Sequence, residues 1–569
     1  MGIGTTWVDE RLMAAAGMLE EAPTIFEPHN NVMNAGVLFS LPALISQGLL
    51  KAADIYAPLP KGFYGFVHIL LLLAFMALSR IKNPEQLKRC PPGELGKILG
   101  IDRVPEVRCF RQKLSNIISQ QKAEVFERAL SREWIVKEEC LFFYIDGHVR
   151  VYHGQKANLP KKFVSRQKLC LPGTTEYWVN DEKGLPFMVF TGELNEKLKN
   201  AIEKIIPALV EDTRELVDEK AILQDPDLPR FTIVFDREAY EPAFFAKLWS
   251  EYRVAVITYR KNVKDLWDES EFYKIETKVI EKDVSMLICE KQVQLSGHDF
   301  REIRKLGENG HQTSIITTNK KIDTRQVAGK MFSRWSQENF FRYLIQAYDF
   351  DKLIEYGTEP LNQELTVVNQ LYSQLSYKLK KLREKKARID ARLLELLEKN
   401  IDAHLSHTGL YIKQQASLRE KQAHFEGQIQ QIIQERASVP SRIKLKDMPK
   451  ETRYNKLKYE SKLFMNTIKM IAYRAETALV NMIGPYYKNV EKDGRQVVQE
   501  ILKNDADLIP DYLNNTLTIT LHPLSTPGKN QAVEKICHLL NETQTIYPQT
   551  NLRLIFKTYL NNFASSQDL

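Results

Sequence analysis

Cysteine is scarce and scattered in this sequence. The 569 residues contain six cysteines, and no two of them form a C-x-x-C pair. A zinc site or a framework of disulfide bonds needs such pairs or a denser set, so the pattern argues against both. Free, scattered cysteines are typical of a reducing compartment, and we therefore expect a cytoplasmic protein.

Long hydrophobic runs are also missing. The longest run covers residues 63–78, which is short for a membrane helix and includes His68, so we expect a buried core helix there. The first residues lack the basic segment and apolar stretch of a signal peptide. The sequence therefore predicts no association with a membrane.

A strong charge bias is absent as well. Lys and Arg number 80 against 72 for Asp and Glu, and the formal net charge is +8. This mild excess permits a nucleic-acid partner without requiring one. The chain is 43% hydrophobic, so it can bury real cores, and its length suggests three or four domains.

The first 135 residues are predicted to form a helical N-terminal region. Residues 92–118 contain two short helical patterns separated by a turn with glycine, the form of a helix-turn-helix. Arg108 and Arg111 lie on the second pattern and would face a DNA groove. An ordinary helical hairpin explains the same pattern equally well.

Residues 136–352 change to alternating strands and helices. A meander of strands followed by βαβ crossovers indicates a mixed sheet with helices on its faces, an α/β fold. We also expect a β-rich insertion over residues 262–328, which is too long for a simple loop. The predicted strands are 141–146, its return 147–152, 177–179, 185–190, 231–235, 253–258, 272–279, 284–290, 291–295 and 313–318, and the predicted helices are 193–210, 242–251 and 324–348.

The rest of the chain is predicted to hold a long helical hairpin and a small α/β region. The hairpin region spans residues 353–485, within which residues 361–439 are dominated by Leu, Lys, Glu, Gln and Arg at helical spacing, with a plausible turn at 400–409. A further helix is predicted over about 451–482. Residues 377–389 are densely basic, and so are residues 442–458, although a basic run on a helix is usually a solvated face. The final region, 486–569, is predicted to contain strands at 516–521 and 552–557 around a helix at 531–540.

Three acidic residues are placed so that they could meet. Asp146 and Asp236 end predicted strands, where ligands bind in open α/β sheets, and Glu338 lies on the helix predicted over 324–348. Each also has an ordinary interpretation: a turn residue for Asp146, a helix cap for Asp236 and a solvated side chain for Glu338. Together they form a set of hard oxygen ligands that suits Mg²⁺ and metal-assisted phosphoryl transfer.

The sequence around these acids resembles a known family. The stretches Y-I-D-G-H, F-D-R-E-A-Y and R-W-S-Q-E-N, with a β-rich insertion before the third, are similar to the ribonuclease-H-like catalytic domain of DDE transposases of the insertion-sequence cut-and-paste type. The resemblance covers residues 140–350. Arg334 matches the family's Arg four residues before the Glu, whereas Met331 and Ile345 stand where the family has Tyr and Lys.

The resemblance implies a DDE-type DNA transposase with a ribonuclease-H-like core. Asp146, Asp236 and Glu338 would be its catalytic residues and the ligands of two Mg²⁺ or Mn²⁺ ions. It would cleave DNA at the ends of an insertion sequence and transfer the freed strands to target DNA. It further implies a homodimer on terminal inverted repeats, associated with a bacterial nucleoid.

Several basic residues are expected to contact DNA. Arg237 and Arg334 would lie beside the metal ions, and the loop 156–168 carries five cations and no acid. The full set is Arg237, Arg334, Lys156, Lys161, Lys162, Arg166, Lys168, Arg108 and Arg111. Two alternatives remain open: a ribonuclease-H-fold nuclease that cuts without joining, and a transposase-derived DNA-binding protein without catalytic activity.

Overall fold

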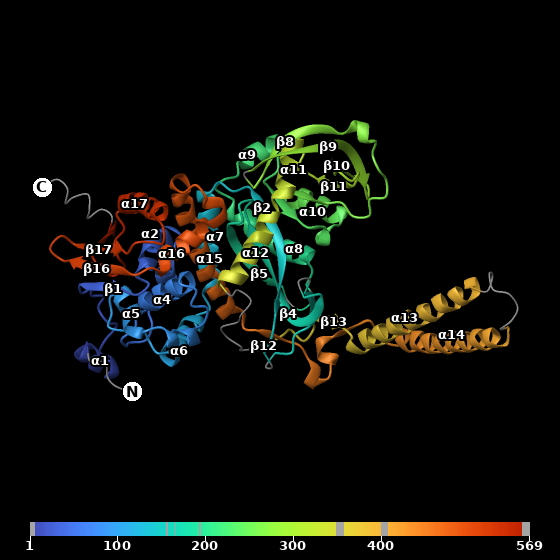
Figure 1. Cartoon of the computed structure of the whole chain (residues 1–569), viewed down its shortest axis with the longest axis horizontal. Coiled ribbons are helices and arrows are strands. Elements are labelled where there is room, and N and C mark those ends of the chain that lie inside the picture. The colour runs from blue at the N-terminus through green and yellow to red at the C-terminus, as the bar shows by residue number, and fades with distance from the viewer. Residues whose placement is uncertain are drawn as a thin grey trace. The chain divides into compact units, whose positions relative to one another are not determined.

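The structure is a computed structural model, and it describes residues 6–154, 157–164, 167–192, 194, 196–280, 282–348, 358–399 and 408–559 (Figure 1). The chain divides into two compact units. The first comprises Met1–Tyr152, Lys162–Gly357 and Lys458–Leu569, and the second comprises His153–Lys161 and Thr358–Leu457. The predicted division into four regions stays a prediction.

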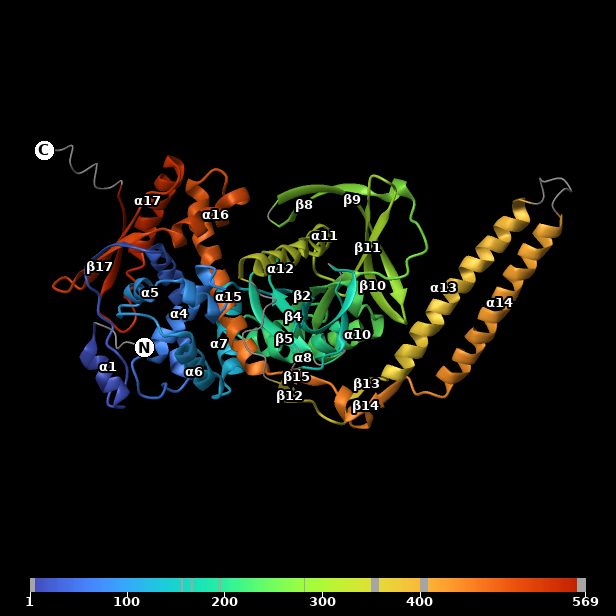
Figure 2. The ribbon, with the colours of Figure 1, turned by 60° about the horizontal axis from the view of Figure 1, so that its bottom comes forward.

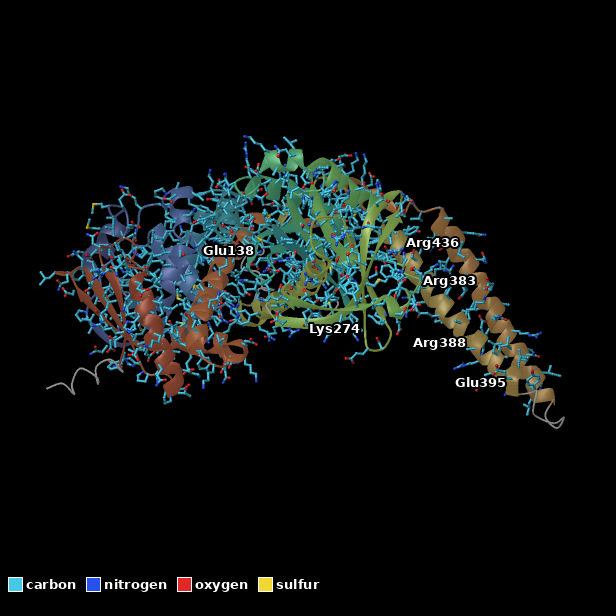
Figure 3. The ribbon with its side chains drawn as sticks, turned by 90° about the horizontal axis from the view of Figure 1, so that it is seen from above. Glu138, Lys274, Arg383, Arg388, Glu395 and Arg436 are labelled. Atoms are coloured by element: carbon cyan, nitrogen blue, oxygen red, sulfur yellow. The ribbon has the colours of Figure 1, made fainter. Side chains whose placement is uncertain are left out.

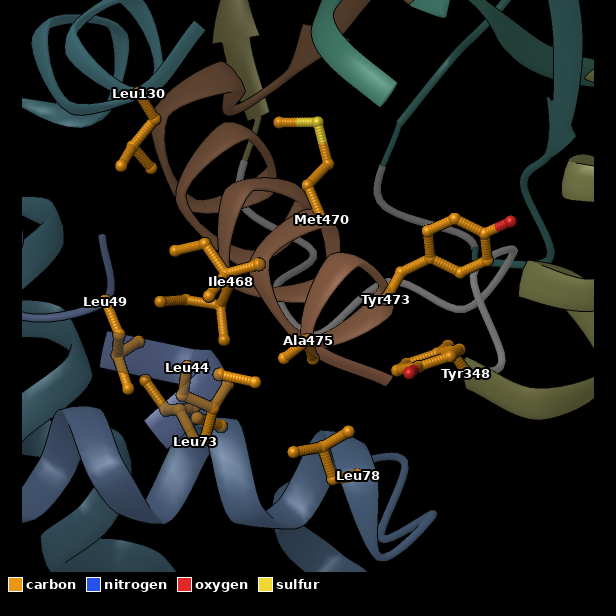
Figure 4. Packing of buried hydrophobic residues seen from close by; sticks show 14 of the residues in the cluster. Leu44, Leu49, Leu73, Leu78, Leu130, Tyr348, Ile468, Met470, Tyr473 and Ala475 are labelled. Atoms are coloured by element: carbon orange, nitrogen blue, oxygen red, sulfur yellow. The ribbon is translucent and has the colours of Figure 1, made fainter. Parts of the chain in front are cut away.

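Helices from both ends of the chain pack together in the first unit. The predicted core helix is confirmed as α4 (Phe66–Leu78), and it is buried along nearly its whole length. It lies against α15 (Tyr459–Ile483), where Leu73 and Leu44 gather near Ile468 (Figure 4). The other helices of this part are α1 (Val8–Ala15), α2 (Leu41–Ser46), α3 (Lys51–Ile55), α5 (Pro92–Ile98), α6 (Val107–Ile118), α7 (Ala123–Lys137), α16 (Val490–Lys503) and α17 (Pro527–Glu542).

A four-stranded sheet joins the two ends of the chain. Its order is β1-β16-β17-β18, and the last two strands are parallel because α17 crosses between them. The bounds are β1 (His29–Val32), β16 (Ala506–Asp511), β17 (Thr516–Leu521) and β18 (Arg553–Thr558). The C-terminal strands predicted from the sequence are therefore present, and they share their sheet with an N-terminal strand.

The middle of the first unit is organised by a ten-stranded mixed sheet. Its order is β3-β4-β2-β6-β7-β11-β10-β9-β8, with β5 paired to β4. Strands β2, β6 and β7 run parallel, and β4 and β11 flank them antiparallel. The bounds are β2 (Phe142–Val151), β3 (Lys161–Val164), β4 (Leu169–Asn180), β5 (Pro186–Gly192), β6 (Phe231–Phe235), β7 (Val254–Tyr259), β8 (Tyr273–Val279), β9 (Lys282–Leu295), β10 (His298–Leu306) and β11 (Gln312–Thr317).

Both faces of the central strands are covered, as their apolar runs indicate. Phe143, Ile145 and Phe235 pack into the larger core, whereas Tyr144 and Val234 pack into a second cluster on the opposite face. The covering helices are α8 (Leu198–Asp212), α10 (Pro242–Tyr252), α11 (Thr324–Ser333) and α12 (Trp335–Tyr348), which Figure 2 shows around the sheet. The short helix α9 (Glu219–Gln224) precedes β6 in the chain. The predicted α/β class is thus confirmed as a mixed α/β fold.

Several predicted boundaries are wrong. The strand 141–146 and its return 147–152 are one continuous strand, β2, so Asp146 and Gly147 form no hairpin turn. The strands 284–290 and 291–295 are likewise one strand, β9, while β10 was not predicted at all. The helix 324–348 is broken at Arg334 into α11 and α12. The predicted insertion over 262–328 is rich in strands, as expected, and these strands extend the main sheet.

The second unit contains the predicted helical hairpin. Helices α13 (Gln370–Lys399) and α14 (Thr408–Ala437) lie side by side in Figures 1 and 2. They are antiparallel, because Lys386 pairs with Glu426 at 2.5 Å while Arg436, near the far end of α14, lies over the ring of Tyr372. Short strand pairs stand at the base: β12 (Thr358–Pro360) with β15 (Asn455–Leu457), and β13 (Thr366–Val368) with β14 (Arg442–Lys444).

No helix among the residues that the structure describes is long and apolar enough to cross a membrane.

Candidate active site

The parallel pairing of β2 with β6 brings Asp146 next to Asp236. The last pair in register is Ile145 with Phe235, so the two aspartates directly follow it on neighbouring strands. Strand β6 ends there, whereas β2 continues to Val151. Asp146 therefore lies in the middle of its own strand, yet at the carboxyl edge of the parallel pair, where ligands bind in such sheets.

Each aspartate also bonds to its own backbone. Asp146 Oδ1 accepts a hydrogen bond from the Gly147 N–H at 2.8 Å, and Asp236 Oδ1 accepts one from the Arg237 N–H at 2.8 Å. The second bond caps the short 3-10 helix Arg237–Ala239, the ordinary role for a strand-end Asp. One oxygen of each carboxylate remains for another partner.

Helix α12 places Glu338 at the same edge. Gln337, which is fully buried, donates through Nε2 to the Tyr144 carbonyl at 2.6 Å and to Asn180 Oδ1 at 3.2 Å. Those contacts attach the first turn of α12 to β2 and β4. The contact on β2 is with Tyr144, two residues before Asp146. Glu338 follows directly on this anchored turn.

Arg334 links two of the three acids. Its Nη1 donates to Asp146 Oδ2 at 3.2 Å, and its Nη2 donates to Glu338 Oε1 at 3.3 Å. The side chain is only 12% exposed, and its Nε has no hydrogen-bond partner among the described residues. Arg334 occupies the break between α11 and α12, so the broken helix is what aims its guanidinium at Asp146.

The electrostatics show that the neighbouring charges act on Asp146. Burial raises the pKa of Asp146 to about 6, with further upward contributions from the charges of Asp236 and Glu338. Arg334 and the Gly147 N–H act in the opposite direction. The carboxylate of Asp146 is therefore costly to ionise unless a cation is near.

The donor set fits a hard cation, although no closed site is present in the described residues. No group of three or more His, Cys, Asp or Glu side chains in the described part of the chain is arranged to hold a metal ion. Carboxylate oxygens are the ligands that Mg²⁺ prefers, and mutual repulsion at Asp146 is what a bound cation relieves. In this structure the guanidinium of Arg334 supplies the positive charge.

A basic pocket lies beside Asp236. Its volume is about 780 Å³, and Arg237, Arg260, Lys261, Lys264 and His311 are among its lining residues. They come from the end of β6, the segment after β7 and the turn before β11, which are distant in sequence. Sequence reasoning singled out Arg237 alone among these cations, because only the sheet pairing of β7 with β11 assembles the rest.

The predicted DNA-contacting loop is only partly described. Lys156 and Arg166 lie outside the described residues. Lys161 and Lys168 are exposed, and Lys162 is half-buried. Burial lowers the pKa of Lys162, while the charges of Glu238 and Glu196 raise it by a smaller amount.

The two short helices predicted over 92–118 are present as α5 and α6. Arg108 on α6 is exposed, and Arg111 pairs with Glu85, with Nε 3.1 Å from Oε1. The structure therefore brings together Asp146, Asp236, Glu338, Arg334 and Arg237, while Arg108 and Arg111 belong to the helical part of the unit.

Comparisons with known proteins give one broad match. Residues 2–559 match the family described as "Transposase protein". No curated protein matches the chain. Among solved structures, the piggyBac transposase in a synaptic complex with hairpin DNA is similar at 7% identity and a TM-score of 0.29, with 79% of this chain and 77% of that chain covered. A likeness of that size supports no conclusion about fold or function.

The family match spans nearly the whole chain, including the sheet edge with its three acids and both ends of the first unit. This protein therefore belongs to a transposase family.

Proposed function

We propose that this protein is a DDE transposase whose ten-stranded sheet contains a ribonuclease-H-like catalytic core. The observation that carries the proposal is the pairing of Ile145 with Phe235, which sets Asp146 beside Asp236, together with Arg334, which ties Glu338 to Asp146. The reaction is metal-dependent cleavage at the ends of an insertion sequence, followed by transfer of the freed strands to target DNA.

Asp146, Asp236 and Glu338 would hold two Mg²⁺ or Mn²⁺ ions. When bound, such ions activate the attacking oxygen and stabilise the leaving oxygen of a phosphoryl transfer. Asp146 must be ionised to act as a ligand, and its raised pKa means that ligand binding and proton release are coupled. The protein otherwise contributes position and charge.

Arg334 and Arg237 would orient the DNA backbone. Arg334 contacts both Asp146 and Glu338, so its guanidinium stands where a phosphate approaches these acids and can form charge-assisted hydrogen bonds to it. Arg237 lies on the other side of Asp236, at the basic pocket. We propose that this pocket takes the DNA strand next to the reacting phosphate, with the protein bound as a homodimer to the inverted repeats.

The substitution Asp236→Asn tests the proposed site. It removes one negative ligand but keeps the shape and the cap on Arg237, so we expect cleavage of an insertion-sequence end to fall more than about a hundredfold while DNA binding persists. The matched control is Glu238→Gln, an exposed acid two residues away that lies outside the set. Equal cleavage rates for the two variants would refute the site.

A strand-transfer assay separates the proposed function from its alternatives. The protein is incubated with a pre-cut DNA end, Mg²⁺ and plasmid, and joined products are measured. Joining supports a transposase. Cleavage without joining identifies a nuclease, and DNA binding without cleavage in either Mg²⁺ or Mn²⁺ identifies a DNA-binding protein.

A further inference from the structure

Helix α13 carries a row of five cations on one face. Lys378, Lys381, Lys385, Arg388 and Arg392 follow each other at alternating intervals of three and four residues, the spacing that keeps side chains on one side of a helix. All five are exposed. At about 1.5 Å per residue the row, here named the α13 stripe, is roughly 21 Å long.

The stripe is distinct from the face that holds the hairpin together. Leu375, Leu379 and Ile389 form the buried face of α13. The polar contacts to α14 come from other positions: Lys386 pairs with Glu426, and Asp390 accepts a hydrogen bond from Gln422 at 2.8 Å. The hairpin is therefore held without the stripe.

Within the described residues the stripe is almost free of acidic partners. Lys381 pairs with Glu384 on the same helix, with Nζ 3.0 Å from Oε2. No ion pair joins Lys378, Lys385, Arg388 or Arg392 to another described residue. Figure 3 shows Arg388 among the side chains that stand along the hairpin. Like charges three and four residues apart destabilise a helix slightly, so such a row costs stability unless a partner neutralises it.

Helix α14 lacks a comparable row. Its cations are Lys413, Arg419, Lys421 and Arg436, at intervals of six, two and fifteen residues, so they form no row on one face of the helix. A helix that needs charge only for solubility shows this scattered pattern with acids interleaved. On α13, by contrast, the five cations of the stripe are aligned on one face of the helix.

We propose that the α13 stripe binds the sugar-phosphate backbone of duplex DNA without reading its sequence. The inference rests on the proposed function for the choice of DNA as partner. Its physical basis is charge complementarity: duplex DNA carries one negative charge per about 1.7 Å of axis, and five cations over roughly 21 Å can each neutralise a phosphate and release a counterion. The stripe lies in the second unit, so it adds a DNA contact beyond the proposed catalytic site.

The test compares two variants of the full chain that lose equal charge. The stripe variant changes Lys378, Lys381, Lys385, Arg388 and Arg392 to Gln, and the control variant changes Lys380, Arg383, Lys413, Arg419 and Lys421 to Gln. Glutamine is a good helix former, so both should keep the helical content of the wild type, which circular dichroism checks. Affinity for a duplex of arbitrary sequence is then measured between about 50 and 200 mM KCl.

We expect the stripe variant to reduce the magnitude of the negative slope of log K against log salt by about 3 to 4.5, because each lost phosphate contact removes about 0.9. The control variant should change that slope by less than about 1. Equal slopes for both variants would overturn the stripe as a DNA contact. A wild-type slope combined with an altered oligomeric state would also overturn it, and would assign this face to an interface between copies.

Failure of the stripe to bind DNA can be distinguished from failure of the proposed transposase function. The slope reports DNA binding, whereas the Asp236→Asn comparison reports cleavage. A stripe without effect leaves the cleavage result intact, and a protein that does not cleave can still show the change in slope.

Discussion

Glu127 is a buried acid and Asp146 a partly buried one, and their surroundings favour different protonation states. Glu127 on α7 is 4% exposed, and Oε1 accepts a hydrogen bond from the Val189 N–H at 2.8 Å. Burial raises the pKa of Glu127 to about 8, so it stays protonated near neutral pH. Burial raises the pKa of Asp146 only to about 6, with the charge of Arg334 acting against the rise, so Asp146 ionises at a lower pH than Glu127.

The pKa of Glu127 predicts how stability changes with pH. The unfolded chain ionises this acid near pH 4.3, whereas the folded chain keeps the proton until about pH 8, so the free energy of unfolding should decrease as pH rises between these values. We expect Glu127 to account for a decrease of about 5 kcal/mol. Glu127→Gln should remove that contribution, as measured by urea unfolding at acidic and alkaline pH.

Glu124→Gln is the control for this experiment. Glu124 lies on the same helix but is exposed, so its loss should leave the pH dependence of unfolding unchanged. If Glu127→Gln and Glu124→Gln gave the same pH profile as the wild type, the protonated state assigned to Glu127 would be incorrect.

At the scale of elements, helix α12 is held at both ends. Gln337 anchors its first turn to the sheet, and Tyr343 and Tyr348 near its end donate hydrogen bonds to the carboxylate of Glu476 on α15. Glu476 is fully buried and also accepts from Arg80, with Nη2 2.8 Å from Oε2. One carboxylate thus connects α12, which carries Glu338, to α15 and to Arg80, two residues after the end of α4.

Replacing Glu476 with Gln should destabilise the protein strongly. The side chain of Arg80 is only 11% exposed, and the change removes the charged partner of its guanidinium. Breaking a buried pair in this way costs about 3–5 kcal/mol. Urea unfolding measures the loss, and cleavage should fall as well because the end of α12 is released.

An exposed ion pair provides the matched comparison. Glu85 pairs with Arg111, and the two side chains are 52% and 47% exposed. Glu85→Gln should cost no more than about 1 kcal/mol. A similar loss from both substitutions would show that Glu476 does not hold α12 in place.

At the scale of the whole molecule, the chain segments just before α13 and just after α14 lie next to each other in the second unit. The Asn369 N–H donates to the Ser441 carbonyl at 3.0 Å, and Val368 pairs with Arg442 across β13 and β14. The ends of the hairpin are therefore adjacent, so the two strands can be joined directly.

Deleting residues 370–440 together with Ser441→Gly should leave a folded protein. The new sequence Val-Asn-Gly-Arg places Asn-Gly between paired strand residues, which is a favourable two-residue hairpin turn. We expect the shortened protein to keep the unfolding transition of the first unit and metal-dependent cleavage at low salt, but to lose the salt dependence assigned to the α13 stripe. Calorimetry and the DNA-binding titration measure these effects.

The full chain with Ser441→Gly alone is the control, and it should behave as the wild type. A shortened protein that aggregates, or that cleaves no better than Asp236→Asn, would show that the first unit depends on the hairpin.

The local sequence alone determined the elements with strong periodicity. The apolar run became α4, the β-rich run 231–235 became β6, and the leucine spacing became α13 and α14. These patterns are readable because a helix or strand that buries one face repeats apolar residues at its own period. The three candidate acids were also found from their positions beside such elements.

Tertiary structure decided the features that depend on distant partners. Strand β10 escaped prediction because its buried positions include Glu302 and Arg304, which pair with each other at 2.7 Å and so replace the apolar alternation of an ordinary strand. Strand β2 runs through Asp146 and Gly147 because β4 pairs with it on both sides of this Asp-Gly step, which overrides the local turn signal.

Distant partners also decided how the candidate acids are arranged. Sequence could name Asp146, Asp236 and Glu338, but the register of β2 with β6 and the break at Arg334 arise from hydrogen bonds and ion pairs between segments far apart in the chain. Likewise, β1 finds its partner β16 at the other end of the protein. Local sequence carries the period of an element, whereas its neighbours are chosen by the packing of the whole chain.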